Sequence, residues 1–333
     1  MKIIPEPGHV YHFAGGTINQ TGVPAEYETM TGKPFGYCGN TVWVDLPGTR
    51  GWTFSKNGII AALTQAQKER RGLSLSIGFA KTAITKFGEA EDAAVAAGTY
   101  DPQLKELAAV FIQFAKVPVM LRIGNEVNGS WQGHHAGKPW KDCYRRFVDT
   151  LRTAGVKNVT YCLCFEPHGS DPFKADGTSD WWPGAEYVDW IGLDLFHSNT
   201  FAGLVQANAA LTVQEQRSKS VLDYAKANNK PVFLAETAMA ECDPKTDLAT
   251  GLAVYLKWMD PWFAMLVKYP QIKAFAIMPV DWSKAGGADF AVWGNARFQD
   301  NPVLWGRWMS FLTMKGAGYG LIHLPQFQAA YGL

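Results

Sequence analysis

The sequence predicts an α/β fold, a closed (β/α)8 TIM barrel that forms a single domain over residues 1–333. Eight short apolar segments with strand character mostly alternate with longer segments, several of which carry apolar residues at helical spacing. This alternation is typical of parallel strands joined by helices, and eight repeats are the number that closes a barrel. The chain has 333 residues, of which 47% are hydrophobic, and this is enough for one large core.

The expected strands are, in order, 10–16, 41–46, 73–80, 117–126, 159–167, 188–196, 231–238 and 272–282. Helical segments are expected at 57–72, 102–116, 140–155, 211–229 and 252–270, followed by a closing helix from residue 302 onward. The structural alternative is a doubly wound open sheet, but no GxGxxG pattern follows the first strand. Two long polar and aromatic loops, 177–187 and 283–302, follow the fifth and eighth strands, where barrel loops line the active-site face.

Composition and charge narrow the range of partners. The formal net charge of +1 gives no electrostatic reason to expect nucleic acid, and no apolar run is long enough to span a membrane. Thirteen Trp residues and 13% aromatic residues suit a carbohydrate partner, because the C–H faces of sugars stack on aromatic rings. The five Cys lack zinc-site spacing, and we expect free, mostly buried thiols. Because no signal peptide is visible, we expect a cytoplasmic protein, or a secreted one if a leader was removed.

Two glutamates stand at the ends of apolar, strand-like runs. Glu126 ends VPVMLRIGNE, and Glu236 follows PVFLA. The carboxyl ends of barrel strands meet at one rim, so the two carboxyl groups are expected to face each other across the barrel mouth. Glycoside hydrolysis requires such a pair, because one group protonates the leaving oxygen and the other attacks carbon or activates water.

Strand alternation predicts where the neighbours of these glutamates point. In VMLRIGNE, Arg122 shares a face with Glu126, while Leu121 and Ile123 point outward to the helices. In PVFLAETA, an inward Glu236 implies that the residues at 233 and 235, Phe and Ala, point outward.

These segments resemble the retaining glycosidases of clan A, which carry an acid/base Glu after the fourth strand, commonly preceded by Asn, and a nucleophilic Glu after the seventh. Asn125-Glu126 and Glu236 match those places. Within the clan, the chain is most similar to glycoside hydrolase family 26, which includes β-mannanases and has an acid/base segment of roughly R-P-x-H-E-M-N-G-x-W. The positions kept here are Arg122, Glu126, Asn128, Gly129 and Trp131. Gly124-Asn125 replaces x-His, Val127 replaces Met, and VDWIGLDLF resembles the family's sixth strand, V-D-Y-V-G-x-D.

The resemblance implies a retaining β-glycoside hydrolase that cleaves a β-linked poly- or oligosaccharide by double displacement. The substrate implied is β-mannan, with xylan or glucan as alternatives. Glu126 would be the acid/base and Glu236 the nucleophile, with Arg122 as a candidate cation beside it. Retention predicts carboxyl groups about 5–5.5 Å apart. The clan's pattern also implies that Asn125 binds the sugar 2-hydroxyl.

Further substrate-binding candidates follow other strands. Trp282 ends the eighth strand, where the clan commonly has an aromatic floor, and His197 stands where a residue often bonds the nucleophile. Trp131 lies in a strand-following loop and could stack on sugar. His12 ends the first strand, and Glu166 follows the fifth and could bind sugar hydroxyls.

Two other functions remain open. A barrel that binds carbohydrate without catalysis would have the same fold and aromatic cleft. A Schiff-base aldolase or lyase would need a barrel lysine, for which Lys81 qualifies, although that function leaves both glutamate motifs unexplained. His134-His135 lacks metal-ligand spacing, and no GxSxG nucleophile motif is present, so we expect no metal and no cofactor.

Overall fold

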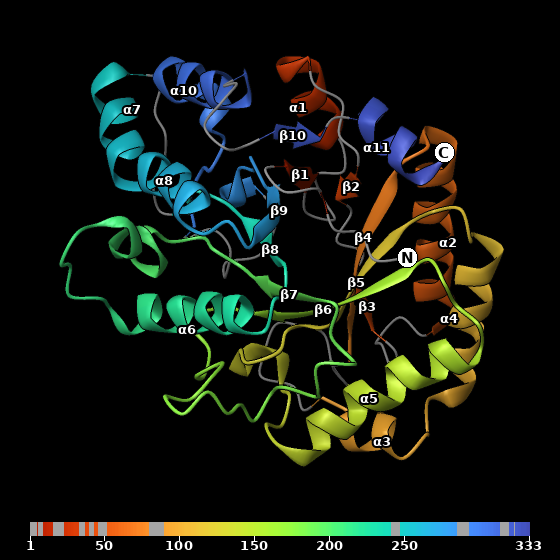
Figure 1. The fold of residues 1–333 in the computed structure, drawn as a ribbon. Helices are drawn as coiled ribbons and strands as arrows, with labels where there is room; N and C mark the ends of the chain where they lie inside the picture. The colour runs from red at the N-terminus through yellow and green to blue at the C-terminus, as the bar shows by residue number, and fades with distance from the viewer. Residues whose placement is uncertain are drawn as a thin grey trace.

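The structure is a computed structural model that describes residues 5, 9–15, 23–32, 37–39, 43–45, 52–79, 90–240, 247–284, 293–313, 320–322 and 324–333. Figure 1 shows strands at the centre of the molecule with helices around them. The predicted architecture, parallel strands alternating with helices, is confirmed. None of the helices in these ranges combines the length and the apolarity that crossing a bilayer requires.

The strands form one parallel sheet that closes into a ring. Their order is β10-β1-β2-β4-β5-β6-β7-β8-β9, with β3 beside β4, and β9 pairs with β1 to close the ring. Because β2 and β3 pair with successive parts of β4, they occupy one position of an eight-position barrel. Their bounds are β1 His9–Gly15, β2 Tyr37–Gly39, β3 Trp43–Asp45, β4 Gly72–Gly78, β5 Val119–Glu126, β6 Val159–Phe165, β7 Trp190–Leu193, β8 Val232–Thr237, β9 Ile272–Ile277 and β10 Gly320–Ile322.

The helices surround this ring. They are α1 Val23–Thr31, α2 Trp52–Glu69, α3 Asp92–Ala96, α4 Asp101–Gln113, α5 Lys138–Thr153, α6 Val213–Ala227, α7 Leu248–Val254, α8 Asp260–Lys268, α10 Pro302–Thr313 and α11 Leu324–Tyr331. A π-helical turn, η4 (Tyr255–Met259), joins α7 to α8. Short 3-10 turns are η1 Ser130–Gln132, η2 Ser198–Thr200, η3 Ala202–Val205, η5 Trp282–Lys284 and η6 Phe298–Asp300. Local sequence explains sharp starts such as that of α6, where Thr212 and Glu215 form a reciprocal capping box.

Strand side chains divide between two apolar layers. The larger layer lies between strands and helices and contains the aliphatic residues of β5, Leu121 and Ile123, which confirms their predicted outward direction. The smaller layer combines residues from β1, β5, β6, β7, β8 and β9 and therefore fills the barrel interior. Three described cysteines are free and buried, as predicted, namely Cys143, Cys162 and Cys164.

One end of the barrel is closed by the last helix. Phe327 of α11 is fully buried and belongs to the interior layer, where its ring meets Tyr11 of β1 edge-on at 6.1 Å. The Tyr11 and Tyr331 hydroxyls lie 3.2 Å apart. Gln328 donates to the carbonyl of Arg70, which precedes β4, so α11 covers the amino-terminal end of the strands. The sequence did not predict β10 or α11.

Candidate active site

A fully buried arginine organises the carboxyl ends of the strands. Nη1 of Arg122 on β5 donates to Oδ2 of Asp194, just after β7, at 3.1 Å, and Nη2 binds Oε1 of Glu236 on β8. The Cys164 thiol donates to Oδ1 of the same aspartate at 3.3 Å. A single guanidinium therefore ties β5 and β8 together, and the predicted contact between Arg122 and Glu236 is present.

Glu126 reaches this site through a bulge in β5. The register on β6 passes from Arg122 opposite Cys162 directly to Glu126 opposite Cys164, so β5 contains two more residues than β6 over this stretch. Gly124 and Asn125 absorb the extra length with φ of 79° and 54°. An insertion of two residues preserves the alternation of side chains. Arg122 and Glu126 therefore point to the same face, although the prediction had assumed a regular strand.

Glu236 also lies in a bulge, and here the predicted side-chain directions of its neighbours were wrong. Phe233 and Ala235 belong to the barrel-interior layer, whereas they were expected to point outward. Between Leu234 and Thr237, β8 has one more residue than β9, where the corresponding partners are Phe275 and Ile277. A single extra residue reverses the alternation, so Glu236 reaches Arg122 although residue 235 also faces inward.

The surroundings of Glu126 favour its protonated form. Burial is the main cause that raises the pKa of Glu126 well above its usual range. Three negative charges raise that pKa further, those of Asp194, Glu236 and Glu166. The hydrogen bond donated by Trp131 Nε1 to Glu126 Oε2, at 2.5 Å, acts in the opposite direction.

Asn125 lies beside the acid/base candidate and is almost fully buried. Its Oδ1 accepts a hydrogen bond from the Ser76 hydroxyl on β4 at 3.2 Å. The Ser76 bond directs the amide, so β4 helps to orient the residue next to Glu126. Trp131 in η1, predicted as a stacking platform, contacts Glu126 directly through its indole nitrogen.

Glu166 closes the side of the site formed by the loop after β6. It is 4% exposed, and its Oε1 lies 2.7 Å from Nδ1 of His168. Asn128, in the loop after β5, binds both backbone groups of Glu166, accepting from its N–H at 2.9 Å and donating to its carbonyl at 2.8 Å. The rings of His168 and His197 meet edge-on at 5.1 Å.

The remaining predicted aromatic residue lies at the end of the β9 segment. Trp282 in η5 is 4% exposed and meets Phe196 at 6.4 Å and Trp293 at 5.1 Å. Trp293 in turn lies 6.2 Å from the His197 ring. The loops after β7 and β9 are thus joined by aromatic contacts, and the sugar-binding roles of Trp282 and His197 stay predictions.

Two candidates lie outside the described side chains. The backbone of His12 pairs with Phe275 in the sheet, but its side chain lies beyond the described ones. Lys81 falls outside the described residues altogether. Within the described ranges, no three His, Cys, Asp or Glu side chains are grouped so that they could hold a metal ion.

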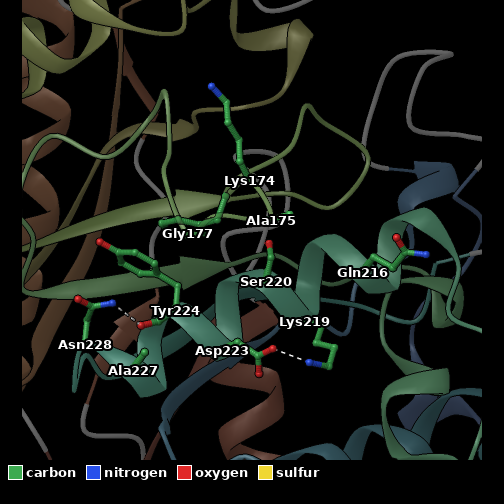
Figure 2. A pocket seen from close by; sticks show the side chains of 11 residues that line it. Lys174, Ala175, Gly177, Gln216, Lys219, Ser220, Asp223, Tyr224, Ala227 and Asn228 are labelled. Carbon is green, nitrogen blue, oxygen red and sulfur yellow. Dashed lines mark hydrogen bonds and ion pairs between the residues drawn. The ribbon is translucent and has the colours of Figure 1, made fainter.

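A groove on the outside of the barrel is separate from these residues (Figure 2). It has a volume of about 560 Å³ and lies between α6 and the loop after β6. Its walls include Lys174, Gln216, Tyr224 and Asn228, and neither glutamate of the candidate pair lines it.

Sequence reasoning missed the role of Asp194. Its position in VGxD-like WIGLD was noticed as a resemblance, but its ion pair with Arg122 was not predicted. The available signal was an acidic residue at the end of an apolar strand run, the same signal that identified the two glutamates. Burial raises the pKa of Asp194, against the opposing positive charge of Arg122.

Comparison with known proteins agrees with this geometry. A β-1,3-xylanase of Vibrio sp. is 26% identical over 249 residues, 69% of this chain and 50% of that protein. A mannan endo-1,4-beta-mannosidase of Bacillus subtilis is 26% identical over 180 residues, 51% of this chain and 41% of that protein. The chain thus spans about half the length or less of these relatives.

The fold is shared with solved structures. The catalytic domain of an endo-beta-1,4-mannanase from Bacillus sp. JAMB-750 superposes with a TM-score of 0.64 at 15% identity, covering 95% of this chain and 88% of that one. The model of glycosyl hydrolase family 26 matches residues 89–262, which include both glutamates, Arg122 and Asp194. This match covers more than half of the sequence, and the chain belongs to glycosyl hydrolase family 26.

Proposed function

We propose that this chain is a retaining β-glycoside hydrolase in which Glu126 is the acid/base and Glu236 the nucleophile. The observation that carries the proposal is the contrast between the two carboxyl groups. Burial and neighbouring negative charge favour the protonated form of Glu126, whereas Glu236 is ion-paired with the guanidinium of Arg122. Different environments for two carboxyl groups at one site are how glycosidases separate the acid from the nucleophile.

In the first step, a carboxylate oxygen of Glu236 forms a bond to the anomeric carbon while the glycosidic C–O bond breaks. The proton of Glu126 goes to the departing oxygen. The products are a glycosyl ester on Glu236 and the released part of the substrate, and Glu126 is left as a carboxylate.

In the second step, Glu126 accepts a proton from water while the water oxygen bonds to the anomeric carbon. The ester bond to Glu236 breaks, which restores its carboxylate and the proton on Glu126. Esterification removes the negative charge of Glu236, one of the charges that raise the pKa of Glu126. The pKa of Glu126 therefore falls at the stage where this residue must act as a base. Retention requires the two carboxyl groups to lie about 5–5.5 Å apart.

The substrate we propose is a β-linked polysaccharide of the kinds cleaved by the relatives, β-1,3-xylan or β-mannan. The partly buried indole of Trp131 supports a sugar ligand, because it offers apolar surface beside the hydrogen-bonding carboxyl group of Glu126. Glucan remains the further alternative from the sequence. Incubation with each polysaccharide, followed by product sizing, distinguishes the glycans and separates internal from terminal cleavage.

The mechanism is tested with Glu236→Ala and Glu126→Ala on an activated aryl glycoside of the sugar that the polysaccharide assay identifies. Glu236→Ala should lose essentially all turnover, because no ester can form. Glu126→Ala should form the ester but hydrolyse it slowly, and azide should restore turnover because azide attacks without a base. Near-normal turnover by Glu236→Ala contradicts the mechanism. If the unmodified protein binds a glycan but turns over none of these substrates, a barrel that binds carbohydrate without catalysis becomes the better description.

A further inference from the structure

The bulge that carries Glu126 has a buried contact that the proposed chemistry does not use. The carbonyl of Gly124, the first left-handed residue of the bulge, lies 3.0 Å from Nε2 of His134. A carbonyl oxygen only accepts hydrogen bonds, so Nε2 carries a proton and donates it to this bond. The contact satisfies a backbone group in the stretch where β5 departs from regular pairing with β6.

His134 is itself fixed from the opposite side. Its Nδ1 lies 2.8 Å from Oδ1 of Asp92, the first residue of α3, and both side chains are 1% exposed. Oδ2 of Asp92 accepts the backbone N–H of His135 at 2.9 Å. The imidazole also packs on Trp140 at 4.5 Å and on Phe79 at 5.9 Å, which leaves it little freedom to rotate.

We propose that His134, held by Asp92, is a positioning residue for Glu126. By binding the Gly124 carbonyl, it fixes the two left-handed residues that determine where Asn125 and Glu126 point. This inference rests on the proposed function, because it assigns His134 a role through the acid/base group. His134 does not touch the reacting atoms in this account.

Two observations indicate that the contact between His134 and the Gly124 carbonyl affects the position of Glu126 as well as the stability of the fold. The carbonyl that His134 binds belongs to Gly124, and only Asn125 separates Gly124 from Glu126 in the chain. Space at the bulge is also closed, since a Cβ added at Gly124 would come within 2.4 Å of Trp140 and 2.9 Å of His134 Nε2. A change at His134 therefore reaches Glu126 through a short stretch of strained backbone.

The test compares His134→Phe with His135→Phe, the same substitution at the neighbouring, exposed histidine. Both variants are assayed with dinitrophenyl and phenyl β-glycosides of one sugar. Phenolate is a poor leaving group and needs the proton of Glu126, whereas dinitrophenolate leaves without it. His134→Phe should lower kcat/KM for the phenyl glycoside by about 10- to 100-fold and change the dinitrophenyl value by less than about threefold. Azide should raise the kcat of His134→Phe with the dinitrophenyl glycoside. The control, His135→Phe, should behave like the unmodified protein.

A general loss of structure would lower both kcat/KM values together and would not respond to azide. An unchanged ratio of the two values in folded His134→Phe overturns the proposal. If circular dichroism shows that His134→Phe does not fold, His134→Gln replaces it, because the glutamine amide can still donate to Gly124 but cannot also bridge to Asp92. In His134→Gln, kcat/KM for the phenyl glycoside divided by kcat/KM for the dinitrophenyl glycoside should fall by a smaller factor. An unchanged ratio overturns the proposal.

Glu126→Ala, measured in the same assays, distinguishes a failure of the positioning role from a failure of the proposed function. If Glu126→Ala shows the leaving-group selectivity and the azide response but His134→Phe does not, only the positioning role fails. If Glu126→Ala shows neither, the proposed function fails and the positioning role fails with it.

Discussion

At the scale of single residues, one buried cation and several carboxyl groups make up the candidate site. Arg122 faces Asp194 and Glu236, and both ion pairs are shielded from water. Glu126 has no such cation among its described partners, and its hydrogen bond comes from the neutral indole of Trp131. The two carboxyl groups therefore have different electrostatic environments, an ion pair for Glu236 and burial beside negative charges for Glu126.

The alkaline limit of activity should move in opposite directions when two neighbours of Glu126 are changed. In the proposed mechanism activity needs protonated Glu126, so the alkaline limb of the kcat/KM profile is expected to follow its pKa. Glu166→Gln removes a negative charge that raises this pKa, and the limb should move to lower pH. Trp131→Phe removes a hydrogen bond that lowers the pKa, and the limb should move to higher pH. Shifts in the same direction in both pH profiles would contradict the assignment of Glu126 as the acid.

Glu126 should also reduce the stability of the fold at neutral pH. Its pKa is raised in the folded state, so its favourable contribution is complete below the unfolded value, near pH 4.3, and is lost as pH rises through the folded value. Glu126→Gln should therefore raise Tm at pH 7, by about 2–4 °C for each kcal/mol regained, and leave Tm nearly unchanged near pH 4. The control is Glu106→Gln, since the pKa of Glu106 is lowered by Lys56 and its loss should not stabilise. A stabilised control, or no gain at pH 7 for Glu126→Gln, would contradict this account.

At the scale of elements, both glutamates depend on β-bulges. β5 inserts two residues before Glu126, and β8 inserts one around Glu236. Strand alternation gave the right direction for Glu126 because an insertion of two preserves it, and the wrong directions for Phe233 and Ala235 because an insertion of one reverses it. The sequence shows where strands end, but the register between neighbouring strands depends on contacts across the sheet, which no local pattern reveals.

Gly124→Ala should damage the bulge more than its backbone angle alone explains. Gly177 is the matched control, because its φ of 79° equals that of Gly124 but nothing lies within 4 Å of an added Cβ. Gly177→Ala should cost about 1–2 kcal/mol of unfolding free energy, which is the usual cost of alanine at a positive φ. Gly124→Ala should cost about 1–3 kcal/mol more, because its Cβ meets Trp140. Urea unfolding measures both, and equal losses would mean that Trp140 moves aside freely.

At the scale of the whole molecule, the candidate site and the closing helix lie at opposite ends of the barrel strands. The acidic residues and Arg122 gather at the carboxyl ends of the strands, and α11 closes the amino-terminal ends. The barrel, its strand segments and the two glutamates were predictable, because apolar runs and helical periods repeat along the chain. β10, α11 and the Arg122–Asp194 pair were not, since short terminal elements lack periodicity and ion pairs depend on tertiary contacts.

Phe327→Ala should weaken the fold without altering the reaction. Phe327 is fully buried in the barrel interior against Tyr11, so its loss should lower the unfolding free energy by about 3–5 kcal/mol. At temperatures where the variant stays folded, kcat and KM should equal those of the unmodified protein, because the site lies at the other end of the strands. A selective change in KM would show that the two ends are coupled.

The amide of Asn128 has a consequence for the loops at the candidate site. It holds the backbone of Glu166 on both sides and donates to the carbonyl of Ser170 at 2.7 Å, so the segments after β5 and β6 are joined before any ligand arrives. Immobilising loops at the moment of association costs conformational entropy that weakens affinity. Here that ordering already belongs to the folded state, so the proposed sugar ligand would meet a preorganised rim.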